Sequence, residues 1–250
     1  MSRVWSGRPR SRGARTRQEA RVAARPKSAT GDGAEGAAGA LKPLLRGWIH
    51  AGMAPVSIIL GIALVARSPT PAARISTAVF AAATILLFVT SAVYHRGTWS
   101  PRVFGVLRRM DHANIFLVIA GTYTPLAVLL LSNRTATILL WVVWSGALIG
   151  ILARVFWLGA PRWFYVPVYL ALGWVAVGFI PAFWHSGGPT VAWLIMAGGL
   201  AYTLGAVVYG LKRPNPSPRW FGFHEIFHVG TVIGYACNYV AVAITAFSLR

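Results

Sequence analysis

His224-Glu225-Ile226-Phe227-His228 opens the last long apolar segment of the chain, which continues to about Phe247. As a helix, this segment is long enough to cross about 30 Å of hydrocarbon. Residues four apart on a helix lie one above the other, with roughly 6 Å between their Cβ atoms, so both imidazoles point the same way. Two neutral imidazoles on one face can bind a first-row metal, most often Zn²⁺. The stretch therefore predicts a membrane helix that begins with part of a metal site.

The composition of the whole chain favours a membrane protein. Hydrophobic residues make up 56% of the 250 residues, charged residues only 12%, and the mean hydropathy is +0.59. A soluble domain carries about twice that share of charged residues. Long apolar runs separated by short basic loops predict an all-α bundle of seven transmembrane helices. These spans are expected near residues 47–66, 74–95, 111–131, 135–156, 163–183, 190–211 and 224–247.

The N-terminal part of the chain differs from the rest. Residues 1–44 combine scattered arginines with Gly, Ala and Ser and hold no apolar periodicity, which predicts a disordered basic tail. We expect no secretory signal peptide there, because no continuous apolar core precedes Leu41. Residues 45–250 form the predicted membrane domain. The lone cysteine, Cys237, lies in an apolar run and excludes an intrachain disulfide.

The distribution of positive charge predicts the orientation. With seven spans, 20 of the 24 Lys and Arg residues lie on the side of the N-terminal tail and four on the other side. Positive residues stay inside, so we expect a cytoplasmic N-terminus and an outside C-terminus in the cell inner (plasma) membrane. The net charge of +19 would also suit a nucleic-acid partner. Topology explains the charge better, so we expect no nucleic-acid partner.

Few ionisable residues lie at membrane depth, where they are costly and mark functional sites. In this topology the second span ends, and the third and seventh spans begin, at the cytoplasmic face. His95, Asp111 and the pair His224 and His228 therefore reach one depth from three helices. We predict a zinc site with His95, His224 and His228 as ligands and an open fourth position for water.

Asp111 and Ser91 complete the predicted site. An open three-histidine zinc lowers the pKa of a bound water to about 7 and polarises a carbonyl. Asp111 is the expected base for that water. Ser91, four residues before His95, faces the same side and would bond the water or a substrate oxygen, or else its own helix backbone. Three other histidines are expected outside the ligand set: His112 in a structural or supporting role, and His50 and His185 at the membrane interface.

Glu225 makes the opening stretch match H-E-x-x-H, the zinc-protease signature in which the glutamate is the general base. Such sites need a third ligand further along, and neither an acid nor an imidazole follows His228. An intramembrane metalloprotease nevertheless stays an alternative. In the other interpretation, Glu225 pairs with a cytoplasmic-loop arginine such as Arg108 or Arg109, or favours the helix N-terminus.

Four motifs together resemble those of the bacterial hemolysin III proteins, which belong with the progestin and adipoQ receptors, including the adiponectin receptors. The motifs are Ser91-Ala92-Val93-Tyr94-His95, Leu107-Arg108-Arg109-Met110-Asp111-His112, Ala120-Gly121-Thr122-Tyr123-Thr124-Pro125 and His224-Glu225-Ile226-Phe227-His228, and the resemblance covers about residues 45–248. It implies seven helices, a cytoplasmic N-terminus and a buried zinc on His95, His224 and His228. It also implies that Asp111 holds the zinc-bound water, with Ser91 nearby. Glu225 departs from the glutamine of the animal receptors, so the resemblance gives it no role.

The resemblance also suggests a chemistry, because the wider superfamily includes alkaline ceramidases. Our leading hypothesis is a zinc-dependent hydrolase of a lipid amide or ester, with its site in the cytoplasmic leaflet and a membrane lipid as substrate. The alternative is a non-enzymatic, zinc-braced sensor of lipid or ligand. A cytolysin or pore former is a weaker alternative, because no span carries a polar stripe that would line an aqueous pore.

Overall fold

The computed structural model describes residues 43–157 and 159–248, so the expected tail, 1–44, lies outside it except for Pro43 and Leu44. Within the described residues the chain is helical, and only one isolated β-bridge, between Ser217 and Phe221, interrupts that pattern. The all-α prediction is confirmed. The helices are α2 (Trp48–Arg67), α3 (Pro71–Arg96), α4 (Pro101–Leu130), α5 (Asn133–Phe156), α6 (Arg162–Gly173), the 3₁₀ helix η2 (Trp174–Phe179), α7 (Ile180–Leu211) and α8 (Phe223–Phe247).

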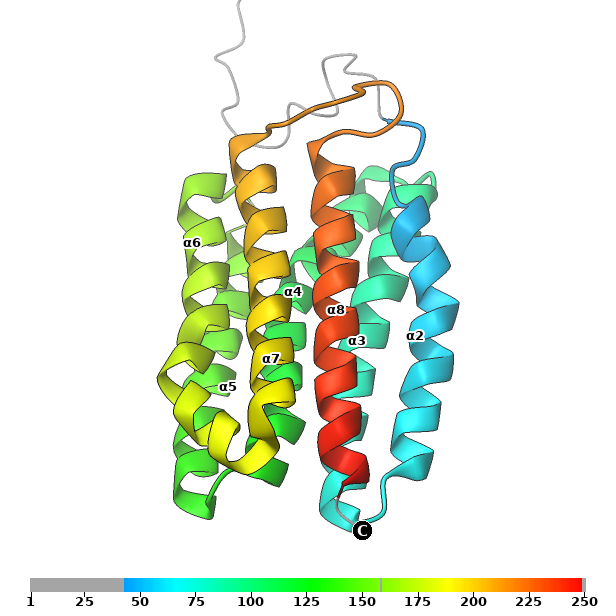
Figure 1. The fold of residues 1–250 in the computed structure, drawn as a ribbon. Helices are drawn as coiled ribbons and strands as arrows, with labels where there is room; N and C mark the ends of the chain where they lie inside the picture. Colours follow the sequence, from blue (N-terminus) through cyan, green and yellow to red (C-terminus); the bar gives the residue numbers. More distant parts are fainter. Residues whose placement is uncertain (1–42, 158, 249–250) are drawn as a thin grey trace, which may run out of the picture. The chain divides into compact units, whose positions relative to one another are not determined.

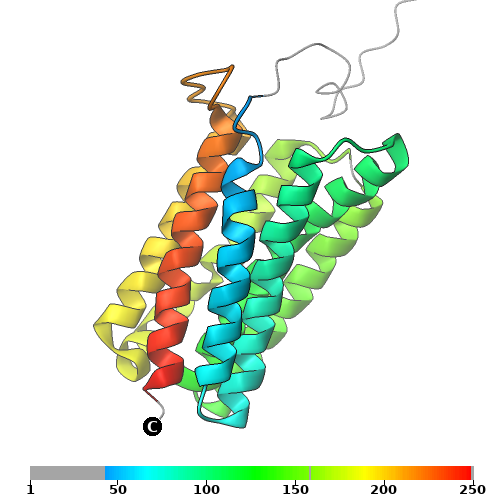
Figure 2. The same cartoon turned by 90° about the vertical axis from the view of Figure 1, so that its right-hand side faces the viewer.

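The helices pack into a bundle in which sequence neighbours lie side by side, α2 with α3, α3 with α4 and α4 with α5 (Figure 1). The last helix, α8, lies between α7 and α2, as the view in Figure 2 also shows. This arrangement brings the beginning of α8 next to the beginning of α2. The first and last helices of the described chain therefore begin at the same end of the bundle, and the described chain finishes at the opposite end (Figure 1).

Local sequence explains where the helices begin. Thr70 accepts a hydrogen bond from the Ala73 backbone N–H at 3.1 Å, and Pro71 occupies the first helical position, where its fixed φ suits a helix. The same Ser/Thr-Pro pattern at Ser100-Pro101 begins α4 ten residues before the predicted span, which was expected from residue 111. The apolar run located only the membrane-depth part of α4. Its first turns are basic and extend beyond that run.

Among the described residues, six helical stretches are long and apolar enough to cross a membrane. One of them, Arg162–Leu211, counts 50 residues and is interrupted at Gly188, whose φ of 78° and ψ of 170° are not helical. Glycine adopts this conformation readily because it has no Cβ. Figure 1 shows that α6 and the later part of α7 run in opposite directions. The reversal falls in the Gly187-Gly188-Pro189 sequence between the predicted fifth and sixth spans.

A second interruption separates α6 from η2 in the middle of the bundle. Tyr123 on α4 compensates for it, because its hydroxyl donates to the Gly173 carbonyl at 2.6 Å and accepts from the Ala176 backbone N–H at 2.7 Å. Irregular backbone at membrane depth requires such partners from the protein, since lipid supplies none. One tyrosine therefore stabilises the break from α6 to η2.

Glycines bring α7 and α8 into close contact. A Cβ at Gly230 of α8 would lie 2.9 Å from the Ala201 carbonyl oxygen and 3.1 Å from Cα of Gly205, both on α7. Small residues of this kind let helix backbones approach where no hydrophobic force drives them together. The close packing fixes α8, which carries two of the predicted metal ligands, against α7.

Candidate metal centre

The three predicted ligands come together in the structure. His95 lies near the end of α3, and His224 and His228 lie in the first turns of α8. Their candidate ligand atoms all lie within 4.8 Å of one another, and the Nε2 atoms of His95 and His224 are 3.2 Å apart. His95 and His228 are buried, and His224 is half-buried. These side chains could hold a metal ion.

The spacing of His95 and His224 fits zinc. Tetrahedral Zn²⁺ with bonds of about 2.05 Å to imidazole separates its ligand nitrogens by roughly 3.3 Å, close to the 3.2 Å between His95 Nε2 and His224 Nε2. Two ring nitrogens that face each other at this distance cannot both carry a proton, and a shared cation satisfies both lone pairs. Three neutral imidazoles are also a donor set that suits zinc.

Asp111 and Ser91 lie beside the histidine cluster. The Asp111 carboxylate on α4 is 3.8 Å from His95 Nε2, and the Ser91 hydroxyl interacts with it. Hydroxyls earlier in α3 behave differently, since those of Thr77 and Thr84 donate to the backbone of the preceding turn. Ser91 is therefore directed toward the predicted site and its carboxylate.

A cavity of about 150 Å³ extends from this cluster into the bundle. Its polar end is lined by Ser91, Asp111, His224 and His228, and its continuation by mainly apolar residues of α4, α6, η2, α7 and α8. Two lining residues of η2, Trp174 and Val177, are 39% and 46% exposed. Only a thin layer of side chains at η2 thus separates the cavity from the outer surface of the bundle.

Glu225 lies in the same turn as two of the candidate ligands but has different partners. Its carboxylate is fully buried, pairs with the Arg46 guanidinium, and accepts a hydrogen bond from the Gly222 backbone N–H at 2.8 Å. The predicted partners Arg108 and Arg109 are wrong, because Glu225 points toward the start of α2 rather than toward α4. The expected contact with the helix N-terminus is confirmed through Gly222.

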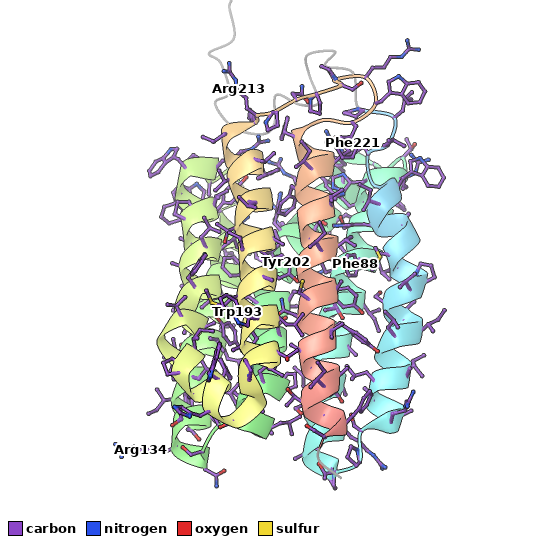
Figure 3. All side chains as sticks on the ribbon, in the orientation of Figure 1. Phe88, Arg134, Trp193, Tyr202, Arg213 and Phe221 are labelled. Atoms are coloured by element: carbon purple, nitrogen blue, oxygen red, sulfur yellow. The ribbon has the colours of Figure 1, made fainter. Side chains whose placement is uncertain are left out.

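His50 is also placed differently from the prediction. We expected it at the interface, but it is only 2% exposed and its ring stacks on His228, with 3.8 Å between centroids and 12° between planes. Its other neighbour, Phe88 on α3, is packed edge-on at 5.1 Å and is labelled in Figure 3. The second histidine expected at the interface, His185, is exposed. The prediction failed for His50 because the start of α2 lies against α8, which no local pattern reveals.

Arg154 is a buried residue for which no role was predicted from the sequence. It lies in the last turn of α5, is 1% exposed, and places Nη2 3.0 Å from His112 Nδ1. Its guanidinium carbon is also 4.3 Å from the centroid of the Tyr165 ring. His112 therefore has a structural partner, in keeping with its expected role. The available signal was the position of Arg154 inside an apolar run, within the predicted span 135–156.

Comparisons with known proteins agree with the resemblance seen in the motifs. A family model described as Haemolysin-III related matches residues 39–239, which include all three histidines and Asp111. The "Hemolysin-3 homolog" of Bacillus subtilis (strain 168) is 30% identical over 150 residues, which cover 60% of this chain and 70% of that protein. The "Hemolysin-3" of Bacillus cereus is 29% identical over 189 residues, or 75% of this chain and 82% of that protein. With its membrane-length helices, this chain is a multi-pass membrane protein that belongs to the hemolysin III family.

Proposed function

We propose that the chain crosses the cell inner (plasma) membrane seven times with its N-terminus in the cytoplasm. A continuous helix of the 50 residues Arg162–Leu211 would be about 75 Å long, more than twice the hydrocarbon thickness, so the reversal at Gly188 supports two passes. Arg134 and Arg213 lie at opposite ends of the bundle (Figure 3). Most arginines outside the tail belong to the Arg213 end, which supports a cytoplasmic location of that end and of the histidine cluster.

We propose that the protein is a zinc-dependent hydrolase of a lipid amide or ester. The observation that carries this proposal is a cluster of three histidines beside Asp111, of which His224, His228 and Asp111 line the polar end of a long, mainly apolar cavity. An apolar cavity with a few convergent polar groups is the usual form of a small-molecule site. The apolar walls suit the hydrocarbon chain of a lipid, and the polar end suits its amide or ester group.

The chain's own residues have distinct parts in this chemistry. When bound by His95, His224 and His228, zinc would polarise a carbonyl and make a water acidic enough to ionise near neutral pH. Asp111, close to His95, accepts the proton of the attacking water and returns it to the leaving amine or alkoxide. Ser91 holds the carboxylate in place, and the apolar wall positions the lipid chain and limits access of other water.

The test uses the purified full-length protein, with zinc measured by mass spectrometry and hydrolysis measured on ceramides, glycerol esters and phospholipids. Asp111→Asn should keep the metal and lower the rate by about 10²–10⁴-fold, the usual contribution of a general base. Thr122→Val is the matched control, since Thr122 lines the same cavity but its hydroxyl donates to its own helix backbone. Bound zinc without turnover of any lipid class in the wild type would rule out the hydrolase.

A non-enzymatic, zinc-braced sensor is the second candidate. The observation that favours it is that the histidines belong to α3 and α8, so a metal would crosslink two helices that are distant in sequence. On this hypothesis His228→Ala lowers the melting temperature sharply, whereas Asp111→Asn leaves the biological function intact. Lipid hydrolysis that depends on Asp111 would contradict it.

The other two alternatives receive less support. A metalloprotease of the H-E-x-x-H type needs its glutamate free to act as base, whereas the Glu225 carboxylate is held by Arg46 and Gly222. Two relatives carry hemolysin names, which suggests a pore former. The cavity of this chain gathers its polar groups mainly at one end and is otherwise mostly apolar, a poor lining for an aqueous pore. Conductance of the purified protein in planar bilayers, abolished by a point mutation, would restore the pore hypothesis.

A further inference from the structure

The segment that leads into α2 supplies none of the three candidate ligands, yet it is attached to the loop before α8. The backbone N–H of Leu44 donates to the Arg219 carbonyl at 2.9 Å, and that of Leu45 donates to the Trp220 carbonyl at 3.3 Å. These two hydrogen bonds join parts of the chain that are far apart in sequence. They bring residues 46–50, which we call the α2 entry turn, to the candidate metal centre.

The strongest contact of the α2 entry turn is the ion pair between Arg46 and Glu225. The Glu225 side chain is fully buried, and that of Arg46 is only 14% exposed. Glu225 lies between His224 and His228 on a single stretch of helix, so an anchor on its carboxylate restrains both imidazoles together. The second carboxylate oxygen of Glu225 accepts a hydrogen bond from the Gly222 backbone N–H at the N-terminus of α8. This bond holds the first turns of α8, which carry His224 and His228, in place. A buried pair of this kind is costly to break from one side, because the remaining charge stays buried.

Two further contacts connect the α2 entry turn to the other ligands. Gly47 has a φ of +81° and lies so close to α3 that a Cβ there would be 2.5 Å from Cβ of His95. Glycine is required at this position by both its conformation and the close approach. His50, one turn of helix further on, stacks on the His228 ring at 3.8 Å. The α2 entry turn thus touches His95, His228 and the glutamate beside His224.

We propose that the α2 entry turn positions the three metal ligands, with Arg46 and His50 as positioning residues that act through Glu225 and His228. The proposal rests on the metal centre of the proposed function and adds a role for residues that do not bind the metal themselves. Partners that orient metal ligands typically account for 10–100-fold in metal affinity. Glu225 is then part of the support of the centre and not a general base.

The experiment measures zinc affinity of the full-length protein by competition with a chromophoric chelator, together with the visible spectrum of the Co²⁺-loaded protein. Arg46→Gln should weaken zinc binding by about 10–100-fold and alter the Co²⁺ spectrum, which reports coordination geometry. Arg46→Lys keeps the positive charge and should recover most of the affinity. The matched control is Arg109→Gln, because Arg109 is a half-buried arginine at the same end whose hydrogen bonds within the described residues go to the backbone carbonyls of Gly105 and Val155.

A second pair of variants tests the stacking contact independently of the ion pair. His50→Phe keeps a flat ring against His228 and should retain zinc affinity within about threefold, whereas His50→Ala should weaken it by about 10-fold. Melting temperatures of the metal-free variants show how much each substitution destabilises the protein in general. If Arg46 positions the ligands, Arg46→Gln should lower zinc affinity more than Arg109→Gln does for the same loss in melting temperature.

The outcomes separate this inference from the proposed function. Zinc affinity and a Co²⁺ spectrum unchanged by both Arg46→Gln and His50→Ala, in a protein whose wild type binds zinc, would overturn the positioning role alone. A wild type that binds no zinc would overturn the metal centre itself. A wild type that binds zinc but hydrolyses no lipid, together with the expected loss of zinc affinity in Arg46→Gln and His50→Ala, would contradict the hydrolase and leave the positioning role intact.

Discussion

The two ends of the cavity are built in opposite ways. At the polar end, side chains from α2, α3, α4 and α8 meet one another: His95 faces His224, His50 stacks on His228, and Arg46 pairs with Glu225. At the end formed by α6 and η2, the polar groups include backbone atoms that the broken helix leaves without partners of its own. A single side chain from another helix, Tyr123, compensates for two of them.

This difference in construction separates residues that we expect to serve function from residues that we expect to serve stability. Buried polar side chains that depend on one another are expensive to place, and they persist where they bind or react. Backbone groups at a helix break need only a partner, and any well-placed hydroxyl can supply one. Substitutions at the polar end should therefore change metal binding, whereas substitutions at the break should change the free energy of unfolding and leave the metal in place.

The largest expected effect follows from removing a ligand at the polar end. His95→Ala should abolish zinc binding, because it removes the only one of the three ligands that comes from α3. At zinc concentrations 100 times the dissociation constant, the wild type gains about 2.7 kcal/mol of stability, and the variant should gain none. Thermal unfolding with and without a chelator measures this difference.

The matched control for His95→Ala is His185→Ala, since His185 is an exposed histidine outside the cluster. Its zinc-dependent gain in melting temperature should equal that of the wild type. An equal loss of zinc in both variants would mean that the cluster has no special role and that zinc binds to histidines at the surface.

The sequence allowed much of the bundle to be predicted, because membrane helices are encoded locally in apolar runs. Six helix beginnings or ends at the histidine end of the bundle were placed within a few residues, and the reversal at Gly187-Gly188-Pro189 was expected from its turn residues. The early start of α4 at Pro101 was missed, since its first turns are basic and carry no apolar signal. The break between α6 and η2 was missed as well. It depends on Tyr123, 50 residues earlier, and nothing in the local sequence of α6 announces it.

For the candidate site, topology was enough to bring His95 and Asp111 to the depth of the α8 histidines, and the structure places them together. The predicted topology gives the depth of a residue in the membrane, but it does not say which neighbouring helix the side chain faces. For that reason the partner of Glu225 was predicted on α4, whereas the structure has Arg46, on the segment before α2, in that place. The burial of His50 was missed for the same reason. Pairs of this kind depend on which helices lie side by side, and a single sequence does not carry that information.

An intermediate effect is expected from Tyr123→Phe at the broken helix. The substitution keeps the ring but leaves the Gly173 carbonyl and the Ala176 N–H without their partner, which costs about 1–3 kcal/mol. Zinc content should be unchanged. Tyr239→Phe is the control, because its hydroxyl makes one hydrogen bond, to the Leu60 carbonyl at 3.1 Å, and its loss should cost about 1 kcal/mol or less. Reversible denaturation in detergent measures both, and a loss of zinc in Tyr123→Phe would erase the contrast between the two ends.

The smallest effect is expected at the thin wall formed by η2. Trp174 donates from Nε1 to the Thr203 hydroxyl of α7 at 2.9 Å, and both residues line the cavity. Trp174→Phe removes this link at a cost of about 0.5–1.5 kcal/mol. Trp144→Phe removes an equivalent hydrogen bond, to Thr124 at 3.1 Å, from residues that do not line the cavity, so its cost in stability should be similar.

If lipid enters between η2 and α7, only Trp174→Phe changes KM for a lipid substrate, by up to about 10-fold, and kcat stays constant because the polar end is untouched. Equal KM values for the two variants would place the entry elsewhere, and a changed kcat would show that the two ends of the cavity are not independent.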